Sequence, residues 1–511
     1  MRLRELFRLF DPTLDVSRLP DLRVTQVTED SRQVHPGAVF IARTGARTDG
    51  TRFIDDAARR GAVAVVSARG HQPDPFHPSA GERNRALPVV AVDDPGSAGS
   101  ILAHLLHRQP SRRMSVAGVT GTNGKTTVTY LLRHILRVSG RPCGLIGTVQ
   151  TDDGAHQRPA DMTTPGAVDV ANLMARMVEN GCSACAMEVS SHALAQGRVA
   201  GVRFAAGVFT NLTLDHLDYH GTMEAYAAAK ARLFESLDAS ATAVINADAD
   251  PAWASRMTRR CAARVITFGL NDRADFSARD LSMTPERTSF VLRAPDGQAE
   301  VRMRLLGRHN VENALAAAAT AVDVFGLSVH QIAAALRDAA GAPGRLQRVD
   351  LPGVPFTVLV DYAHTDDALR NVLSALRPLC RAGGRLRVLF GCGGDRDRSK
   401  RPKMAQAACE LADDVYVTSD NPRGEDPQAI VDEVLAGVPA QARGRVLADV
   451  DRRRAIGQIL NDASPGDIVL LAGKGHETYQ LIGDQRLHFD DAEEARRYLN
   501  GLLRGSGATA A

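Results

Sequence analysis

Short apolar runs, separated by glycine, proline and charged residues, recur along the whole chain and predict buried strands. In the first part of the chain these runs cover Ala38–Ala42, Ala62–Val66 and Val89–Val92. Runs of this length that end at turn-forming residues are typical of strands in a buried, mostly parallel sheet. We therefore expect a small α/β domain over residues 1–110.

A second series of runs begins at Val116–Val119, which leads into a glycine-rich turn and then into a helical pattern. The apolar positions of that helix share one face; they are Val128, Leu131, Leu132, Ile135 and Leu136. Further strands are expected near Ala184–Met187, Gly207–Thr210 and Ala243–Ile245. This pattern predicts a central α/β domain over residues 111–343.

The last section, residues 344–511, alternates strands with helical patterns. Its expected strands are Thr357–Val360, Arg387–Phe390, Asp414–Val417 and Ile468–Leu471. Each strand leads into polar or glycine-rich residues, and ligands of open α/β sheets gather at the carboxyl ends of strands. The alternation predicts a third α/β domain.

Two segments rich in small or turn-forming residues, Gln109–Arg113 and Ala340–Gly344, are the expected linkers. A chain of 511 residues is long enough for three domains of ~100–200 residues each. Lysine and arginine number 62 and aspartate and glutamate number 59, so the net charge is only +3. This balance gives no reason to expect a nucleic-acid partner.

The seven cysteines are scattered, and only Cys182 and Cys185 form a CxxC pair. Without a second pair at zinc-ligand spacing, buried thiols in a reducing cytosol are the favoured interpretation. The N-terminus lacks a secretory signal pattern, and no run reaches the ~20 apolar residues that span a bilayer. We expect a cytoplasmic monomer that does not insert into a membrane.

A candidate phosphate-binding loop lies between the strand at Val116–Val119 and the following helix. Its residues are Gly121, Thr122, Asn123, Gly124, Lys125, Thr126 and Thr127. Glycines let backbone N–H groups approach phosphate, and the helix N-terminus favours an anion. Lys125 is expected to neutralise the outer phosphates, and the Thr126 hydroxyl to reach Mg²⁺. The general P-loop pattern has glycine where this chain has Val119, so a plain glycine turn is the alternative.

Acidic and imidazole side chains follow two later strands. Glu188 ends one apolar strand, and the segment Asn211–Gly221 follows another. Each residue alone is more often a helix cap or a satisfied polar group. A carboxylate beside a phosphate loop is nevertheless a suitable Mg²⁺ ligand, and the grouping favours a functional site.

Lys230 lies in a helical stretch and shares its apolar face with Tyr226, Leu233 and Phe234. Such a lysine either extends its amine to water or is held for chemistry. The residues alone favour the first interpretation. Burial would instead lower the pKa of the amine and make it reactive.

Taken together, the motifs resemble the Mur ligase family. The matching segments are 121–127, 188–192, 211–221, Arg308–Asn313, Asp361–Thr365, Gly391–Asp397 and Gly473–Glu477. They occur in family order over all three expected domains. The resemblance implies an N-terminal UDP-binding domain, a central P-loop ATPase-type domain with a mostly parallel sheet, and a C-terminal Rossmann-like domain.

The resemblance also implies an ATP-dependent ligase of peptidoglycan precursor synthesis. It is similar to members that add meso-2,6-diaminopimelate to the D-glutamate of UDP-N-acetylmuramoyl-L-alanyl-D-glutamate through an acyl phosphate, releasing ADP and phosphate. Two sibling activities remain alternatives: a lysine-adding ligase and a folate-polyglutamate ligase. A P-loop switch or transport ATPase, which needs no amine acceptor, is the alternative from another class.

Residue roles follow from the resemblance alone. Beyond the loop residues, ATP contacts are expected at Asn313, Asp361 and His364. Two Mg²⁺ ions are expected, with ligands Thr126, Glu188, His216 and a carbamylated Lys230. The UDP-linked substrate is expected at Ser31, Thr163, Thr164, Ser190, Gln196 and Arg198. The chain departs from the family at Asp366, where relatives often have proline.

Diaminopimelate contacts are expected at Arg396, Asp420, Asn421, Pro422, Arg423, Gly473 and Glu477. Diaminopimelate carries a second amino-carboxylate end where lysine has only an ammonium group. The planar guanidinium of Arg423 can pair with that carboxylate through two hydrogen bonds. The alternative for Arg423, taken alone, is a surface arginine on a type I turn.

Overall fold

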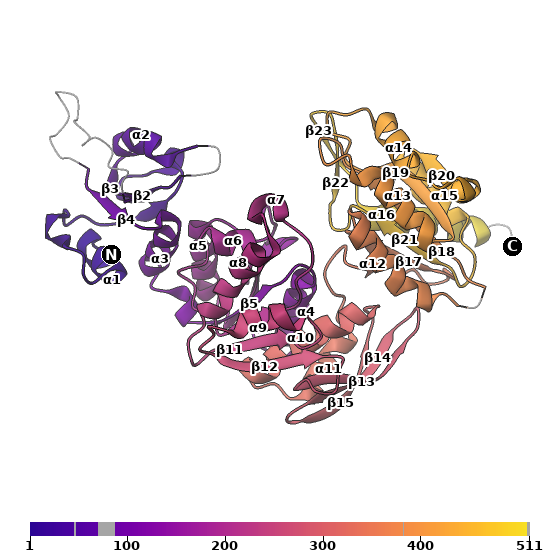
Figure 1. Ribbon diagram of the computed structural model, residues 1–511, viewed down its shortest axis with the longest axis horizontal. Helices are drawn as coiled ribbons and strands as arrows, with labels where there is room; N and C mark the ends of the chain where they lie inside the picture. Colours follow the sequence, from indigo (N-terminus) through magenta and orange to yellow (C-terminus); the bar gives the residue numbers. More distant parts are fainter. Residues whose placement is uncertain (45–47, 70–86, 382, 508–511) are drawn as a thin grey trace. The chain divides into compact units, whose positions relative to one another are not determined.

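The computed structural model describes residues 1–44, 48–69, 87–381 and 383–507, with side chains up to residue 503. The chain forms two compact units (Figure 1). The first contains Met1–Ser277, Arg293–Gly297 and Asn313–Ile332. The second contains Ala278–Leu292, Gln298–Glu312 and the described residues from Ala333 onward.

The first unit begins with a four-stranded parallel sheet. Its strands, in spatial order, are β1 (Gln26–Thr28), β2 (Ala38–Ala42), β3 (Ala62–Ala68) and β4 (Val89–Val92). The helices around it are α1 (Leu3–Phe10), η1 (Val16–Arg18), η2 (Ser31–Gln33), η3 (Gly50–Phe53), α2 (Ile54–Arg59), α3 (Pro95–Leu106) and η4 (Pro110–Arg112). Neighbouring residues of β2 face opposite ways: Ile41 packs with Leu102 of α3, and Phe40 packs with Ile54 of α2. The three strands predicted here are confirmed.

An eleven-stranded sheet follows. Its strands are β5 (Ser115–Thr120), β6 (Cys143–Ile146), β7 (Gln150–Asp152), β8 (Gln157–Pro159), β9 (Ala184–Glu188), β10 (Ala206–Phe209), β11 (Thr242–Asn246), β12 (Arg264–Gly269), β13 (Phe276–Met283), β14 (Thr288–Ala294) and β15 (Gly297–Met303). The spatial order is β15-β14-β13-β12-β11-β10-β5-β9-β6-β7-β8. Strands β12, β11, β10, β5, β9 and β6 are parallel to one another. Strand β5, which feeds the predicted phosphate loop, therefore lies between two parallel neighbours.

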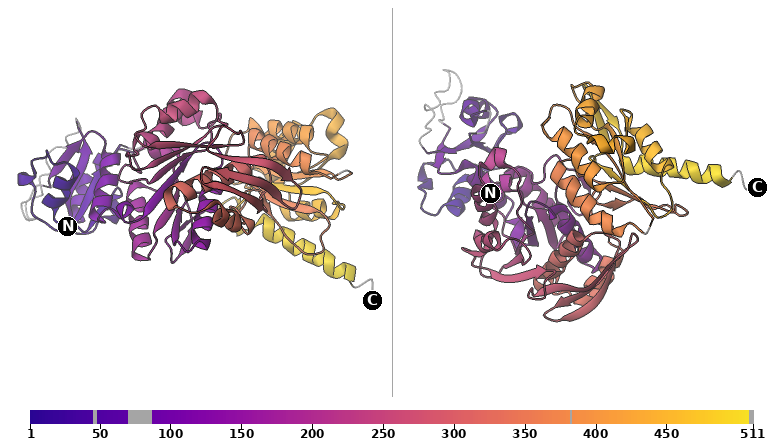
Figure 2. Two further views of the ribbon diagram at one scale, coloured as in Figure 1. Left: turned by 90° about the horizontal axis from the view of Figure 1, so that it is seen from below. Right: turned by 45° about the vertical axis from the view of Figure 1, so that its right-hand side comes forward.

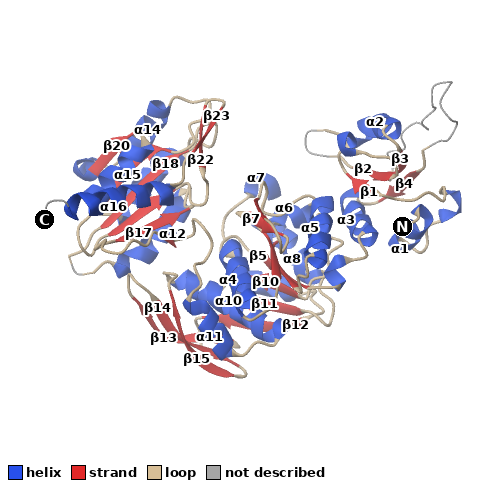
Figure 3. Ribbon diagram, turned by 180° about the vertical axis from the view of Figure 1, so that it is seen from behind, coloured by secondary structure: helices blue, strands red, loops and turns tan. Residues whose placement is uncertain are grey.

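Helices cover both faces of this sheet (Figure 3). They are α4 (Lys125–Val138), α5 (Ala167–Glu179), α6 (Ser191–Ala195), α7 (Leu217–His220), α8 (Met223–Glu235), α9 (Pro251–Thr258), α10 (Arg308–Phe325) and α11 (Val329–Arg337). Met187 of β9 packs with Met174 of α5 and Phe234 of α8 in one apolar cluster. The expected face of α4 is buried, because all five of its predicted apolar positions are inaccessible.

The second unit is built on a six-stranded sheet. Its strands, in spatial order, are β16 (Gln347–Arg348), β17 (Thr357–Asp361), β21 (Ile468–Ala472), β18 (Leu386–Cys392), β19 (Asp414–Ser419) and β20 (Val446–Asp449). A two-stranded hairpin contains β22 (Tyr479–Ile482) and β23 (Gln485–His488). The helices are α12 (Asp366–Leu376), η5 (Arg377–Leu379), α13 (Lys400–Leu411), α14 (Pro427–Leu435), η6 (Ala440–Arg445), α15 (Arg452–Asn461) and α16 (Asp491–Gly507).

Alternating residues of β18 and β21 supply two cores on opposite faces of this sheet. Phe390 and Leu470 pack with α12, α13 and α14, whereas Leu389 and Leu471 pack with α15 and α16. Helix α16 continues past the sheet that it covers (Figure 2). The four strands predicted for this section are confirmed, and the chain is α/β throughout as expected.

A fully buried ion pair holds two strand ends of this sheet. The guanidinium of Arg452, at the start of α15, donates to both carboxylate oxygens of Asp491 at 2.8 and 2.6 Å. It also donates to the backbone oxygens of Ser419 at 3.4 Å and Ala472 at 3.0 Å. Ser419 and Ala472 are the last residues of β19 and β21, so Arg452 connects the points from which two predicted binding segments begin.

The first predicted linker is partly ordered against its surroundings. Pro110 and Ser111 are buried in η4, and the Ser111 hydroxyl accepts a hydrogen bond from Arg203 N at 3.0 Å. Cys182 and Cys185 are buried, as predicted. No helix among the described residues is long and apolar enough to cross a membrane.

Candidate active site

The predicted phosphate loop connects β5 to α4 in the first unit, as expected. Gly121 and Gly124 adopt φ angles of +152° and +88°, which other residues rarely adopt. A β-carbon on Gly124 would come within 2.5 Å of the Asn313 side-chain oxygen. Asn313, a predicted ATP contact on α10, therefore lies against the loop.

Residues at the end of β10 and on α8 brace this loop. The backbone nitrogens of Thr122 and Asn123 donate to the backbone and side-chain oxygens of Asn211, at 3.0 and 2.9 Å. The Thr210 hydroxyl donates to Asn123 O at 2.6 Å. The Thr122 and Tyr226 hydroxyls are 3.3 Å apart. Protein contacts from the end of β10 and from α8 thus hold the loop in this conformation.

Two lysine amines converge on one carbonyl oxygen of the loop. Lys125 Nζ donates to Gly121 O at 2.8 Å and to Thr122 O at 2.7 Å. Lys230 Nζ donates to the same Gly121 O at 2.8 Å. The two lysines come from α4 and α8, so the topology joins residues more than a hundred positions apart. An anion at this position would be favoured by both amines.

Lys230 is buried, with only 1% of its surface exposed. Its amine lies 4.5 Å from the centre of the Tyr226 ring. Burial lowers the pKa of Lys230 well below its usual range, and the charge of Lys125 lowers it further. The interpretation that this lysine extends to water is therefore wrong, because the helix face that carries it is packed against β5 and the loop.

Glu188 provides a buried carboxylate next to the loop. Its oxygens accept hydrogen bonds from the Thr126 hydroxyl at 3.0 Å and from Thr148, through N at 2.8 Å and Oγ1 at 3.0 Å. Glu188 is inaccessible to solvent, and these three donors are neutral groups. A buried carboxylate beside a hydroxyl is a donor set that suits a hard cation such as Mg²⁺.

His216 lies in a cluster of imidazole and phenol rings. Its ring centre is 5.0 Å from that of His192 and 5.9 Å from that of Tyr226. Burial lowers the pKa of His216, which favours the neutral, ligating form of the ring. Within the described ranges, no three His, Cys, Asp or Glu side chains are grouped as a metal site. Of the four predicted metal ligands, only Glu188 and His216 are residues of these four types. The predicted roles of Thr126 and Lys230 as metal ligands therefore stay predictions.

Five of the six residues predicted for the UDP-linked substrate form one hydrogen-bond network next to Glu188. Thr164 Oγ1 donates to Glu188 O at 2.8 Å and accepts from Ser190 N at 3.0 Å. Arg198 donates to Thr164 O at 2.8 Å and to the Gln196 side chain at 2.6 and 2.9 Å. The Thr163 and Thr148 hydroxyls are 3.0 Å apart.

Ser31 lies in the four-stranded part of the first unit, at the start of η2. It is buried, and the Asp30 side chain caps the same turn. Among the described residues, no hydrogen bond or ion pair joins Ser31 to the Thr164 network. Burial raises the pKa of Glu29, two positions earlier, and the charge of Arg198 lowers it. This electrostatic interaction links Glu29 to the network that contains Arg198.

The second unit contains Asp361 and His364 at the carboxyl end of β17. The Asp361 carboxylate accepts from Leu346 N at 2.8 Å and Ala363 N at 2.9 Å, and burial raises its pKa. His364 Nδ1 is 2.9 Å from Tyr362 O, and burial lowers the pKa of His364. Both side chains are engaged by backbone groups of the protein, and their predicted contact with ATP stays a prediction.

The predicted diaminopimelate residues gather around a buried lysine in the same unit. Lys474 Nζ is 3.5 Å from Asp420, 3.5 Å from Glu477 and 3.4 Å from Asn421. Asn421 also donates to Glu477 at 2.8 Å, and a β-carbon on Gly473 would lie 3.3 Å from Asp420. Burial raises the pKa of Glu477, and the Asp420 charge raises it further. A cationic group of a ligand would be favoured next to these carboxylates.

Arg423 and Arg396 lie on two loops that contact each other. Arg423 Nη1 donates to Gly394 O at 2.8 Å, and Gly424 N donates to Asp395 Oδ2 at 3.0 Å. Arg423 and Asp395 both have φ angles of 52°, in the left-handed region. Strained backbone of this kind persists only where surrounding contacts enforce it, and it clusters at functional sites. Arg423 is thus more constrained than a surface arginine on a simple turn.

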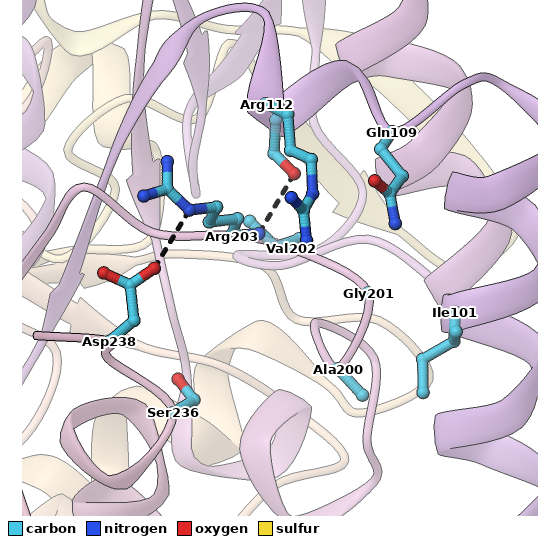
Figure 4. A pocket seen from close by; sticks show the side chains of 10 residues that line it. Ile101, Gln109, Arg112, Ala200, Gly201, Val202, Arg203, Ser236 and Asp238 are labelled. Carbon is cyan, nitrogen blue, oxygen red and sulfur yellow. Dashed lines mark hydrogen bonds and ion pairs between the residues drawn. The ribbon is translucent and has the colours of Figure 1, made fainter. Parts of the chain in front are cut away.

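A cavity of about 500 Å³ opens elsewhere in the first unit (Figure 4). Its lining residues are Ile101, Gln109, Ser111, Arg112, Ala200, Gly201, Val202, Arg203, Ser236 and Asp238. Arg203 is paired there with Asp238 at 3.0 Å. None of the predicted site residues lines this cavity, so the cavity is separate from the predicted phosphate loop.

Several residues that shape the sites were not predicted. Asn211 and Lys474 lie inside recognised motifs but were assigned no role. Thr148 follows the short strand β6, and nothing in its sequence surroundings indicates that it holds Glu188. Gln480 and Arg452 were not predicted either. The Gln480 side chain donates a hydrogen bond to Asp420 O, and Arg452 donates to the backbone oxygens described above. Contacts to backbone groups leave no sequence pattern.

Comparisons with known proteins agree with this fold and loop, which define an α/β enzyme of the P-loop type. Three family models match: "Mur ligase family, catalytic domain" at 23–96, "Mur ligase middle domain" at 119–321, and "Mur ligase, glutamate ligase domain" at 344–475. The chain belongs to the Mur ligase family, and the resemblance seen in the sequence is confirmed.

Two relatives and one solved structure carry the same name, UDP-N-acetylmuramoyl-L-alanyl-D-glutamate–2,6-diaminopimelate ligase. The relative from Gloeobacter violaceus is 46% identical over 503 residues, covering 98% of each chain. The relative from Geobacillus thermodenitrificans is 44% identical over 485 residues, covering 93% of this chain and 94% of its own. The solved structure has a TM-score of 0.71 and 34% identity, covering 97% of this chain and 99% of its own.

Substituting Gly124 tests the geometry of the loop. Gly124→Ala should weaken ATP binding about 100-fold, because the new methyl group displaces Asn313 and with it the loop. The matched control is Gly140→Ala at the end of α4, where φ is +77° and nothing lies within 4 Å of the added carbon. Both variants have the same backbone strain. Titration calorimetry with ATP and Mg²⁺ separates them, and equal affinities would contradict the assigned loop geometry.

Proposed function

We propose that the protein is an ATP-dependent ligase that adds meso-2,6-diaminopimelate to the D-glutamate of UDP-N-acetylmuramoyl-L-alanyl-D-glutamate. The proposal combines the family with two groups of residues: an anion-binding loop in the first unit and a zwitterion-binding cluster in the second. The observation that carries it is the convergence of Lys125 and Lys230 on Gly121 O beside a buried carboxylate.

The first step is phosphoryl transfer to the glutamate side-chain carboxylate of the dipeptide. A carboxylate oxygen attacks the γ-phosphorus of ATP, the bond to the β,γ-bridging oxygen breaks, and ADP leaves. Lys125 and the loop N–H groups neutralise charge on the transferred group, which is the main requirement of such reactions. Arg198 and Thr164 are suited to orienting the UDP-linked substrate, since their network includes Glu188.

Mg²⁺ is the cofactor that this chemistry needs. The residues that would hold it are Thr126, Glu188, His216 and Lys230, the last as its carbamate. Bound Mg²⁺ would supply positive charge to the phosphates. The carbamate forms when the neutral Lys230 amine attacks CO₂ and releases a proton, and the lowered pKa of Lys230 supports this because it favours the neutral form of the amine.

The second step is aminolysis of the acyl phosphate. The amine of diaminopimelate attacks the acyl carbon, a tetrahedral intermediate forms, and phosphate leaves as the amide is made. Asp420 and Glu477 are suited to an ammonium group of the amino acid. Arg423 is suited to the carboxylate that lysine lacks, because a guanidinium pairs with a carboxylate through two parallel hydrogen bonds.

Acceptor-dependent phosphate release tests the substrate. With the UDP-linked dipeptide and ATP, we expect rapid phosphate release with diaminopimelate and little with lysine.

Arg423→Ala should raise the KM for diaminopimelate roughly 10–100-fold, since a charged hydrogen-bonded contact is lost, and leave the KM for ATP unchanged. Lys125→Ala should abolish turnover with either amine. Equal rates with both amino acids, or an unchanged KM in Arg423→Ala, would contradict the proposal.

Carbamylation of Lys230 has a spectroscopic test. The chain contains lysine only at 125, 230, 400, 403 and 474. Protein equilibrated with ¹³C-bicarbonate should show a carbamate carbon signal that is absent from Lys230→Met. The matched control is Lys403→Met, at an exposed position on α13, which should keep the signal. No signal in the wild type, or a signal that survives in Lys230→Met, would rule out the modification.

A further inference from the structure

The hairpin of β22 and β23 contacts three residues of the segment that contains Arg423: Asp420, Asn421 and Arg423 itself. The side-chain nitrogen of Gln480 donates to Asp420 O at 2.8 Å. The backbone nitrogen of Leu481 donates to the Asn421 side chain at 3.0 Å. The first two residues of the segment are thus held by consecutive positions of β22.

The hairpin also pairs with the backbone of Arg423 itself. Arg423 N donates to Leu481 O at 3.0 Å, and Gly483 N donates to Arg423 O at 2.7 Å. These two bonds form a short parallel bridge between Arg423 and Ile482. The left-handed conformation is unfavourable for a residue other than glycine, so at Arg423 it needs such contacts to persist. The hairpin therefore fixes the backbone from which the guanidinium extends.

The guanidinium is held at one nitrogen and open at the others. Arg423 Nη1 donates to Gly394 O at 2.8 Å, and no other partner of this guanidinium is found in the described ranges of the chain. Asp395, next to Gly394, is held through its backbone nitrogen by Glu425 at 2.6 Å. Glu425 is in turn bound by the fully buried Arg401 at 2.8 Å. The orientation of the Arg423 guanidinium is thus set by two segments that are themselves held by hydrogen bonds. Most of its N–H donors have no partner among the described residues.

We propose that hairpin β22–β23 sets the preference for diaminopimelate over lysine by fixing the orientation of Arg423, with Gln480 as the positioning residue. The inference rests on the proposed binding of diaminopimelate at Asp420–Arg423. Gln480 is buried, and its side-chain nitrogen donates to the Asp420 carbonyl, so its effect on the site passes through that backbone group. Because Asp420 and Arg423 lie on one short turn, a shift of Asp420 moves the guanidinium as well.

The matched variants Gln480→Met and Gln485→Met test this role. Methionine keeps the length and volume of glutamine but cannot donate a hydrogen bond. Gln485 lies on the same hairpin with its side chain exposed. Gln480→Met should raise the KM for diaminopimelate about 5–10-fold, the effect of one lost hydrogen bond, and narrow the difference between diaminopimelate and lysine. The kcat at saturating diaminopimelate, the KM for ATP and the melting temperature should stay near the wild-type values.

Gln485→Met should behave as wild type in every assay. A Gln480→Met enzyme with wild-type KM for diaminopimelate and wild-type discrimination against lysine would overturn the proposal. A parallel rise in the KM for ATP would overturn it too, because it would indicate a general structural defect. Arg423→Ala, measured in the same assays, distinguishes a failure of the assigned amino-acid site from a failure of the hairpin role. If Arg423→Ala also keeps wild-type discrimination, the assignment of the amino-acid site fails; if only Gln480→Met does, the hairpin role alone fails.

Discussion

The first unit depends on one crowded contact, in which Lys125 and Lys230 both donate to the carbonyl oxygen of Gly121. Two cations so close repel each other, and burial of Lys230 makes its charged form still less favourable. The site relieves this either by keeping one amine neutral or by binding an anion. Tyr226, Asn211 and Glu188 hold the surrounding groups in place through hydrogen bonds. These contacts suit the loop to phosphate, and the lowered pKa of Lys230 favours the neutral amine that carbamylation requires.

The second unit uses the opposite arrangement. One buried cation, Lys474, is 3.5 Å from the carboxylates of both Asp420 and Glu477 and stabilises their negative charge. Beneath them, Arg452 and Asp491 hold the ends of β19 and β21. A fixed pair of carboxylates next to the guanidinium of Arg423 is complementary to a ligand that carries both ammonium and carboxylate groups. The same polypeptide thus contains one site suited to polyanions and one suited to a zwitterion.

Much of this could be predicted from the sequence, for physical reasons. Strands such as β2, β17 and β21 are continuous apolar runs, because parallel strands are buried on both faces. The short strands β8 and β23 could not be predicted, because they are mostly polar and exposed. The loop was predictable because glycine, lysine and threonine occur at fixed spacing between a strand and a helix. Thr148 and Gln480 were not, because each acts through one hydrogen bond to a partner distant in sequence. Whether Lys230 was buried also depended on tertiary packing that helical periodicity cannot specify.

The central claim is that the loop transfers the terminal phosphate of ATP to the substrate carboxylate before the amide forms. The most direct measurement uses UDP-linked dipeptide labelled with ¹⁸O in the glutamate side-chain carboxylate, with mass analysis of the released phosphate. Because the acyl phosphate breaks between the acyl carbon and oxygen, one labelled oxygen should appear in each phosphate formed during ligation. Unlabelled phosphate, with amide formed at the normal rate, would contradict the account.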